Sequence, residues 1–552
     1  MTVMVVVRRS FLLLASLGFI LTLNLGCRSP WTLQQGPVNR PPPLPQHPQI
    51  EVYFNQNSAH HYTDPYRHIS RDGDNLEELL IETIENAQER IDIAVQELRL
   101  PKLAQAIARQ HQAGVSVRLI LEHDYNRPWS DYSPEEIRQF DDRQRSRYEE
   151  AKRLIDRNND GVMSPEEIAE NDALVVLRNA QVPTLDDTAD GSRGSGLMHH
   201  KFVLIDNNIL VTGSANFTLS GIHGDMGEPA SRGNPNHLLR LDNPQLVSVF
   251  REEFEFMWGG GPEGTLQSRF GLRKPHRPLR SLTVGDTLVS VKFSPTSTTL
   301  PWEQSTNGEI AAALNNAQHQ VDLALFVFSA QDITNQLIER HQARVEVRAL
   351  IDRGFAFRHY SEGLDMLGVA LADEQCRYEV DNQPWDPPIS SVGVAQLPPG
   401  DILHHKFALI DDSLVITGSH NWSNVANVSN DEAVLMIQNQ TVAAHFRREF
   451  DRLYRTAELG LPSHIARRIR EREADCSVMV HRSSDLPEVV DLNTASLEEL
   501  KTLPRIGDVL GQRIIESRPF TNLEDVLQVR GIGEQTLNGW GDRAQVYPSS
   551  NP

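Results

Sequence analysis

Two stretches of the sequence carry the same chemically useful residues at the same spacing. Residues 198–216 read MHHKFVLIDNNILVTGSAN, and residues 403–421 read LHHKFALIDDSLVITGSHN. Side chains two positions apart on a strand share a face, so His199 and Lys201 lie together, while His200 points the other way and is expected to be structural. An imidazole beside a cation can bind an oxyanion and exchange a proton with it.

Each copy continues into a turn of small polar residues, which lets backbone and short side chains approach a ligand closely. Such a cluster suits an oxyanion, and the second copy supplies the same groups at the same spacings. The candidate residues are His199, Lys201, Asp206, Ser214 and Asn216 in the first copy, and His404, Lys406, Asp411, Ser419 and Asn421 in the second. Of these, Asp206 and Asp411 are expected to help position the motif strands.

An internal repeat supplies the elements that position these residues. AQERIDIAVQ matches AQHQVDLALF, and HQAGVSVRLILE matches HQARVEVRALID, at one constant offset. Each match is a helix end that runs into an almost continuously apolar strand, which favours parallel strands covered by helices on both faces. FREEFEFMW and FRREFDRLY indicate an amphipathic closing helix in each half. Two α/β repeats are therefore predicted, over residues 50–260 and 285–455.

The duplicated pattern, His-x-Lys-x4-Asp followed by Gly-Ser-x-Asn, resembles the signature of the phospholipase D superfamily, and both copies match it in full. The resemblance implies two repeats packed about a pseudo-twofold axis with one shared site. It also implies phosphodiester cleavage without a catalytic metal. One histidine attacks phosphorus to give a phosphohistidine, and the other protonates the leaving alkoxide and then activates water. The phosphate would be held by Lys201, Lys406, Asn216, Asn421, Ser214 and Ser419.

The resemblance favours His199 as the nucleophile, although the symmetry of the sequence leaves the choice between His199 and His404 open. Family members often carry a downstream glutamate that orients a catalytic histidine, and Glu432 fits that place. When the halves are aligned, the corresponding residue of the first half is Asn236. This departure predicts two electrostatically unequal histidines, one of them less firmly oriented.

The first half carries an insert that contains a second motif. DRNNDGVMSPEE, residues 156–167, resembles a calcium-binding EF-hand loop, with glycine at loop position six. A helix is expected from Ser133 to Leu154 before the loop, whereas the pattern after it turns strand-like at residues 174–177. A polar turn closed by a capping box is the alternative. We expect the insert, residues 133–172, to bind calcium in a structural role. The ligands would be Asp156, Asn158, Asp160, Val162 and Glu167.

The first segment has the features of an export signal. A short apolar run ends in LNLGC, so residues 1–27 resemble a bacterial lipoprotein signal with lipidation at Cys27. An ordinary secretory signal and an uncleaved anchor are the alternatives, and all three place the rest of the chain outside the cytoplasm, in the cell envelope. Residues 28–49 are rich in proline and predict an extended spacer. In an oxidising compartment Cys376 and Cys476 are expected either to form a disulfide or to remain buried free thiols.

A third domain is predicted over residues 490–546, where a pattern of helix, tight turn and helix occurs twice. The turns LPRIG and VRGIG resemble helix-hairpin-helix motifs, and the whole resembles the DNA-binding module of competence proteins. Backbone amides of such hairpins hold a phosphate, so a strongly basic surface is not required. Packing against protein is the alternative. The candidate DNA contacts are Arg505, Ile506, Gly507, Gly531, Ile532 and Gly533.

Composition limits what the whole chain can do. Its 552 residues suffice for several compact domains, and a formal charge of −21 argues against broad electrostatic capture of polyanions. We expect a phosphodiesterase anchored to a membrane by a lipid, with DNA as the favoured substrate. A phospholipase D acting on membrane phospholipids and a non-catalytic DNA-uptake protein are the alternatives. The sequence leaves open the choice among DNA, RNA and phospholipid, the oligomeric state and the biological process.

Overall fold

The computed structural model describes residues 40–261, 264, 267–379, 381–484, 489–504, 506–533, 536–537 and 539–546. The predicted signal, the lipidation site at Cys27 and most of the proline-rich spacer lie outside the described residues. Within these ranges, no helix is both long enough and apolar enough to cross a bilayer.

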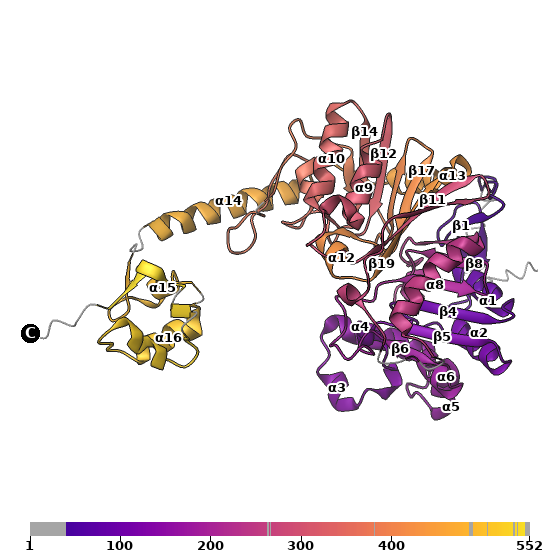
Figure 1. Cartoon of the computed structure of the whole chain (residues 1–552), viewed down its shortest axis with the longest axis horizontal. Helices are drawn as coiled ribbons and strands as arrows, with labels where there is room; N and C mark the ends of the chain where they lie inside the picture. The colour runs from indigo at the N-terminus through magenta and orange to yellow at the C-terminus, as the bar shows by residue number, and fades with distance from the viewer. Residues whose placement is uncertain are drawn as a thin grey trace, which may run out of the picture. The chain divides into compact units, whose positions relative to one another are not determined.

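The first repeat is built on a mixed sheet of seven strands (Figure 1). In spatial order they are β1 (Ile50–Phe54), β9 (His237–Asp242), β8 (Ile209–Gly213), β7 (Lys201–Ile205), β4 (Arg90–Val95), β5 (Ser116–Leu121) and β6 (Thr184–Asp186). The apolar stripes of α1 (Leu76–Glu85) and α2 (Pro101–Gln112) cover one face of this sheet. Helix α8 (Pro244–Trp258) packs on the other face and turns its aromatic residues inward.

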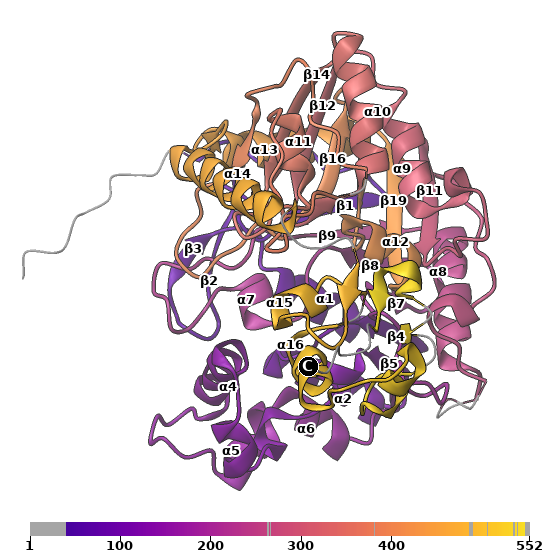
Figure 2. The same ribbon diagram turned by 90° about the vertical axis from the view of Figure 1, so that its left-hand side faces the viewer.

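The second repeat follows the same plan with a nine-stranded sheet (Figure 2). Its order is β10 (Arg280–Val284), β11 (Thr287–Ser294), β19 (Glu432–Gln438), β17 (Leu414–Gly418), β16 (Lys406–Ile410), β12 (Gln320–Leu325), β14 (Glu346–Ile351), β15 (Val392–Val394) and β20 (Glu458–Leu459). Helices α9 (Thr306–Leu314) and α10 (Gln331–Gln342) cover the outer face, and α13 (Gln440–Tyr454) covers the inner one. The α/β fold of two repeats is thus confirmed.

The strand directions correct one expectation. Within the seven- and nine-stranded sheets, the parallel neighbours are β4, β5 and β6 and their counterparts β12, β14 and β15. The motif strands β7 and β16 pair antiparallel with both of their neighbours. Continuously apolar strands indicate burial on both faces, and that burial does not fix direction. The tight turn between β7 and β8 returns the chain at once, which forces an antiparallel pair.

The two repeats share one apolar core. Side chains of α8 and α13 meet there with residues from both sheets, and Phe54 packs edge-on against Phe446 at 5.2 Å between ring centroids. His237 and His405, one from each half, lie 5.3 Å apart between ring centroids in the same core. Burying each aromatic side chain contributes roughly 1.5–3 kcal/mol, so this interface stabilises the placement of the two motif strands.

The insert of the first repeat folds mainly into helices. It comprises α3 (Pro134–Arg138), α4 (Asp142–Ile155), α5 (Pro165–Asn171) and α6 (Ala173–Asn179). The single helix expected from Ser133 to Leu154 is interrupted, because Asp141 caps α4 with a new capping box. Residues 174–177 are helical, which corrects the strand-like expectation. Their apolar side chains join the core beside α2, and a short apolar run by itself does not separate helix from strand.

Helix α14 (Ser463–Ser484) follows the second repeat and is bonded to it. Cys476 of this helix forms a disulfide with Cys376, with 5.4 Å between the Cα atoms, so the disulfide alternative holds. Ile465 and Ile469 of α14 also join the core of the second repeat.

The C-terminal domain has a small core of its own. Its elements include β21 (Val490–Asp491), α15 (Leu497–Leu500), α16 (Asp508–Glu516), the 3-10 helix η5 (Leu523–Gln528) and β22 (Ala544–Gln545). Trp540 is buried among these elements and donates its indole N–H to the Pro504 carbonyl at 3.0 Å. The packing of one hairpin turn is therefore coupled to the end of the domain.

Candidate active site

The motif strands bring an imidazole and a lysine from each repeat into one buried cluster. Lys201 Nζ donates to the His199 carbonyl at 2.8 Å, and Lys406 Nζ donates to the His404 carbonyl at 2.7 Å. Each lysine side chain folds back beside the histidine two residues before it, as the alternation of a strand requires. Both lysines are 1% exposed, so their charges act in a site from which most water is excluded.

The second repeat orients the histidine of the first repeat. His199 Nδ1 lies 2.7 Å from Glu432 Oε2, and the other carboxylate oxygen accepts a hydrogen bond from the Asn430 amide at 3.2 Å. The backbones of the two repeats are also bonded at this point, because His199 N donates to the Asp431 carbonyl at 3.0 Å. The prediction that Glu432 contacts a catalytic histidine therefore agrees with the geometry, and its partner is the histidine of the other repeat.

The first repeat orients the histidine of the second through an amide. His404 Nδ1 lies 2.9 Å from Asn236 Oδ1. The Asn236 amide nitrogen donates to the Gly221 carbonyl at 2.8 Å, which fixes its oxygen toward the histidine. An amide oxygen can only accept, so His404 carries its proton on Nδ1 and presents Nε2 to the site. The two histidines are therefore unequal, as expected: a carboxylate faces His199, and an amide faces His404.

The two motif serines support these orienting residues. Ser214 Oγ donates to Asn236 Oδ1 at 2.8 Å, and the Ser419 side chain hydrogen-bonds Glu432 and accepts from Ala433 N at 3.0 Å. Both serines are at most 2% exposed. Their hydroxyls bond to the residues that orient the two histidines, and phosphate contact by these serines stays a prediction.

The two motif asparagines lie in matching positions but have different neighbours. Asn216 donates to Gln96 Oε1 at 3.2 Å, and the same oxygen lies 3.5 Å from Lys201 Nζ. Phe326 replaces Gln96 in the second repeat, and the ammonium of Lys406 lies 4.9 Å from its ring centroid. Sequence reasoning missed both residues, although their places at matching strand ends of the repeat were a usable signal.

The electrostatics of the cluster suit an anionic ligand. Burial, reinforced by the two lysine charges, lowers the pKa of His199 and of His404 well below the usual range. Burial also lowers the pKa of Lys201 to about 7, and burial with the Lys201 charge lowers that of Lys406. The two lysines and two histidines repel one another when they are protonated. A phosphodiester anion that enters the site would offset this repulsion and favour their protonated forms.

Asp206 and Asp411 lie at the far ends of the motif strands. Five residues of strand place Asp206 roughly 16 Å from Lys201. Its carboxylate accepts hydrogen bonds from the backbone of Gln88, Glu89 and Arg90, and Asp411 does the same for residues 318–320. These bonds lower the pKa of each carboxyl against the opposing effect of burial. Both aspartates hold strands in place, as the strand-positioning expectation states, and neither takes part in the chemistry.

The remaining motif histidines are structural. His200 Nε2 lies 3.3 Å from Glu253, and His405 Nε2 lies 2.9 Å from Glu449. Glu253 also binds Lys274, which lies 2.6 Å from Asp431 Oδ1. This buried network ties the segment between the repeats to the strand that carries Glu432, a connection that sequence reasoning missed.

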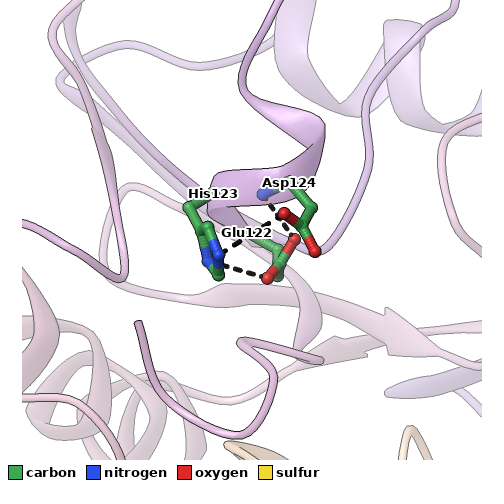
Figure 3. Close-up of side chains that lie close together, drawn as sticks. All are labelled: Glu122, His123 and Asp124. Carbon is green, nitrogen blue, oxygen red and sulfur yellow. Dashed lines mark hydrogen bonds and ion pairs between the residues drawn. The ribbon is translucent and has the colours of Figure 1, made fainter. Parts of the chain in front are cut away.

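The first repeat carries an acidic cluster at the end of β5, formed by Glu122, His123 and Asp124 (Figure 3). The His123 ring lies 2.9 Å from Glu122 Oε1 and 2.9 Å from Asp187 Oδ1. Burial and the neighbouring Asp187 raise the pKa of Glu122 to about 7. His123 thus links β5 to the loop that leads into His199.

The EF-hand-like loop is closed by its own hydrogen bonds. Asp156 accepts from the backbone of Asp160 and Gly161, and Glu167 accepts from Ser164 in a complete capping box. In the part of the chain that the structure describes, the three-residue group with converging ligand atoms is the cluster at Glu122, not this loop. The capping-box alternative is therefore present, and calcium binding stays a prediction.

The residues predicted to contact DNA in the C-terminal hairpin turns differ in exposure. The side chains of Ile506 and Ile532 are each 6% exposed and belong to the domain core, so a contact with DNA at these positions would come from the backbone and stays a prediction. Gly507 caps the start of α16, and nothing lies within 4 Å of a Cβ added there or at Gly533. Gly531 has φ +104°, a conformation that requires glycine. Arg505 lies outside the described residues.

Comparison with known proteins agrees with this geometry. Residues 80–258 and 310–454 match the family described as cardiolipin synthase, PLD-like domain, and residues 487–540 match the helix-hairpin-helix motif. The first match covers more than half of the chain, so the chain belongs to the phospholipase D-like family. It is a member of the phosphodiesterase superfamily whose signature both repeats carry.

Individual relatives cover single parts of the chain. The mitochondrial cardiolipin hydrolase of Xenopus laevis is 28% identical over 187 residues, which cover 33% of this chain and 78% of that protein. A phospholipase D of Rickettsia felis is 28% identical over 137 residues, covering 25% of this chain and 58% of that protein. The human mitochondrial cardiolipin hydrolase is 31% identical over 156 residues, and the chain spans 53% of its length.

Solved structures were also found. NucT from Helicobacter pylori matches with 21% identity and a TM-score of 0.24, covering 31% of this chain and 99% of that one. Phosphatidylserine synthase of Haemophilus influenzae matches with 11% identity and a TM-score of 0.46, covering 80% of this chain and 97% of that one.

Proposed function

We propose that this protein is a nuclease that hydrolyses phosphodiester bonds of DNA through a phosphohistidine intermediate. The observation that carries the proposal is one buried cationic site made from both motifs, in a chain that also has a helix-hairpin-helix domain. Phosphodiester cleavage follows from the site, and the preference for nucleic acid rests on that second domain. The open hairpin glycines, Gly507 and Gly533, give a phosphate backbone access to main-chain amides.

The mechanism assigns different tasks to the two histidines. His199 Nε2 attacks phosphorus, and Glu432 stabilises the positive charge that develops on this imidazole. His404 is doubly protonated once the phosphodiester anion is bound. It gives its Nε2 proton to the leaving alkoxide, keeps the proton on Nδ1, and then uses Nε2 to remove a proton from the water that hydrolyses the intermediate. Lys201, Lys406 and the two asparagine side chains stabilise the phosphoryl oxygens. The mechanism requires no metal, so activity should persist in EDTA.

The location of the protein is part of the proposal. We infer that it is anchored by a lipid at Cys27 and faces outward from the cytoplasm in the cell envelope. The disulfide between Cys376 and Cys476 supports this location, because such bonds persist in oxidising compartments. A structural calcium ion in the loop from Asp156 to Glu167 belongs to the same proposal.

Two substitutions at the hairpins test the delivery of DNA. Gly507 has φ −109°, and both hairpin glycines have open space where a Cβ would lie, so Gly507→Glu with Gly533→Glu should fold and repel phosphate. We expect a higher KM and a shallower salt dependence on long DNA, with a small phosphodiester reporter cleaved as before. The matched control is Gly507→Ala with Gly533→Ala, which adds no charge and should behave as the native protein does. Truncation near residue 485 should resemble the glutamate variant.

Phospholipid vesicles provide the competing substrate. The phospholipase alternative is favoured by the family description and by a membrane anchor. If phospholipid is hydrolysed much faster than DNA, and the hairpin variants change neither rate, the nuclease proposal is wrong. If DNA is bound but no substrate of either kind is cleaved, the non-catalytic DNA-uptake alternative takes its place.

A further inference from the structure

A cavity of about 600 Å³ lies beside His404 and has no task in phosphodiester cleavage itself. It is lined by residues 351–354 and residues 395–403, and Leu403 immediately precedes the catalytic histidine. Asp352 on its wall accepts a hydrogen bond from Leu403 N at 2.9 Å. Cavities of this size commonly hold small organic groups. The cavity therefore lies along the segment that leads into His404, on the second-repeat side of the site.

The cavity is held open by contacts with the other repeat. Asp401 accepts hydrogen bonds from Arg232 N at 2.8 Å and Gly233 N at 3.1 Å. The next residue, Ile402, donates its backbone N–H to Asn234 Oδ1 at 2.9 Å. These bonds fasten the loop from 395 to 403 to the first repeat, while Leu403 N holds its other end to Asp352 after β14. The space behind the loop is thus a fixed feature of the fold.

Aromatic rings stand next to this cavity on the second repeat. Phe326 lies 5.1 Å from the His404 ring, and Phe355 lies 4.8 Å from Phe326, measured between ring centroids. Both phenylalanines are half-buried. Arg353 lines the cavity with a side chain that is 62% exposed, and its guanidinium lies 3.6 Å from the half-exposed Glu458 carboxylate, a loose surface pair that a ligand can compete for. Aromatic faces with a nearby guanidinium are the groups that proteins use to bind unpaired bases.

The corresponding place in the first repeat is filled. Glu122, His123 and Asp124 occupy the positions that match residues 352–354, and they carry the acidic cluster of Figure 3. The loop before His199 closes over this cluster, since a Cβ added to Gly194 would lie 2.6 Å from the His123 ring. Asp187 fastens the loop by accepting from Ser195 N at 2.6 Å. The two sides of the shared site therefore offer different neighbours to a substrate.

We propose that the cavity, with Phe326 and Phe355, binds one unpaired nucleobase on a single side of the phosphodiester that is cleaved. The inference rests on the proposed nuclease activity and narrows its substrate to single-stranded nucleic acid, because a paired base cannot leave its stack to enter a cavity without an energetic cost. Recognition is one-sided, since His123 and the loop bonded to Asp187 occupy the matching place beside His199.

The test uses the whole folded protein and a short single-stranded oligonucleotide with one cleavable phosphodiester among neutral methylphosphonate linkages. Three versions are compared, one with all bases and two with an abasic site on either side of the cleavable bond. We expect kcat/KM to fall roughly 5- to 100-fold for one abasic version and to stay within about twofold for the other. A bis-nitrophenyl phosphate reporter measures the integrity of the catalytic site in every sample.

A variant that fills the cavity sharpens the test. Leu397→Trp, or Ile402→Trp if the first variant is less stable, should abolish the difference between the fully based and the sensitive abasic substrate after normalisation to the reporter. The matched control is Leu288→Trp, which makes the same change at a 52% exposed position on β11, opposite Gln438 at the end of β19 remote from Glu432. This control should keep the native difference.

The outcomes separate the subsite from the proposed function. If neither abasic site, or both alike, lowers the rate on oligonucleotides, the one-sided base site is wrong while the nuclease proposal stands. A Leu397→Trp variant that folds and keeps the native difference also overturns the site. Cleavage of phospholipid vesicles with no cleavage of any oligonucleotide overturns both the subsite and the nuclease.

Discussion

The two half-sites differ in the group that orients each histidine. Glu432 places a carboxylate 2.7 Å from His199, and Asn236 places a neutral amide oxygen 2.9 Å from His404. A carboxylate stabilises a positive imidazole far better than an amide does, so only His199 has a built-in partner for the charge of a phosphohistidine. Two copies of one motif can therefore take different catalytic tasks because the residue that orients each histidine differs, Glu432 in one case and Asn236 in the other.

Removing either histidine should produce the largest effect. His199→Ala and His404→Ala should each lower turnover of DNA by at least ~10²-fold, because neither imidazole can perform both tasks. A substrate with a nitrophenolate leaving group needs no acid, so His404→Ala should still form the covalent intermediate on it, seen as a burst of one equivalent. His199→Ala should give no burst. The reverse pattern would assign the nucleophile to His404.

Replacing the Glu432 carboxylate with an amide should make the two half-sites alike and lower kcat. Glu432→Gln leaves an amide beside each histidine, and we expect kcat to fall on the order of 10²-fold, since the charge on the phosphorylated imidazole loses its partner. Quenched-flow measurement should place the loss in formation of the intermediate. Asp431→Asn serves as the neighbouring carboxylate control, because Asp431 binds Lys274 instead of a histidine. An equal loss in both variants would trace the effect to packing and not to the charge beside His199.

Adding a carboxylate to the second half-site should shift the pH profile. Burial and the lysines hold the pKa of His404 low, and its acid role is lost as pH rises through the pKa of the substrate complex. Asn236→Asp places a negative charge beside His404, which raises that pKa, so the alkaline limb of kcat should move upward by about one pH unit or more. Asn236→Ala removes the hydrogen bond without adding charge and should not move it upward. An unchanged limb in the aspartate variant would remove His404 from the acid role.

The buried lysine of the first half-site should affect stability. The pKa of Lys201 is about 7 in the folded protein, below its value of about 10.4 in an unfolded chain. Between these values the unfolded chain binds more protons, so the free energy of unfolding should rise with pH from 7 to 10, by up to about 3.5 kcal/mol. Denaturant titrations of Lys201→Met should show a smaller rise. Equal slopes would show that Lys201 is not the depressed group.

The smallest effect is expected from the insert, which only the first half carries. Millimolar calcium should raise Tm by a few degrees through selective binding to the folded loop, and EDTA should leave cleavage of a small reporter unchanged. Glu167→Gln should lose the calcium shift while keeping the capping box, which accepts glutamine. Glu166→Gln, at the exposed neighbouring position, serves as the control. No Tm shift in the native protein would remove the calcium site.

The amino-acid sequence was enough to predict the paired motifs and the repeat that carries them. Spacing two residues apart on a strand put each lysine beside its histidine, and the alignment of the halves found that Asn236 stands where Glu432 has a carboxylate. These features are local or repeated, so short-range geometry is enough to read them. The structural role of His200 followed from the same alternation.

Tertiary structure decided which distant groups meet. Only the packing of the two repeats pairs Glu432 with the histidine of the other half, engages Ser214 and Ser419 behind the histidines, and joins Cys376 to Cys476. The cavity beside His404 depends in the same way on bonds from Asp401 to the first repeat. Such contacts join residues far apart in the chain, and their distances follow from how the shared core packs, which no local pattern records.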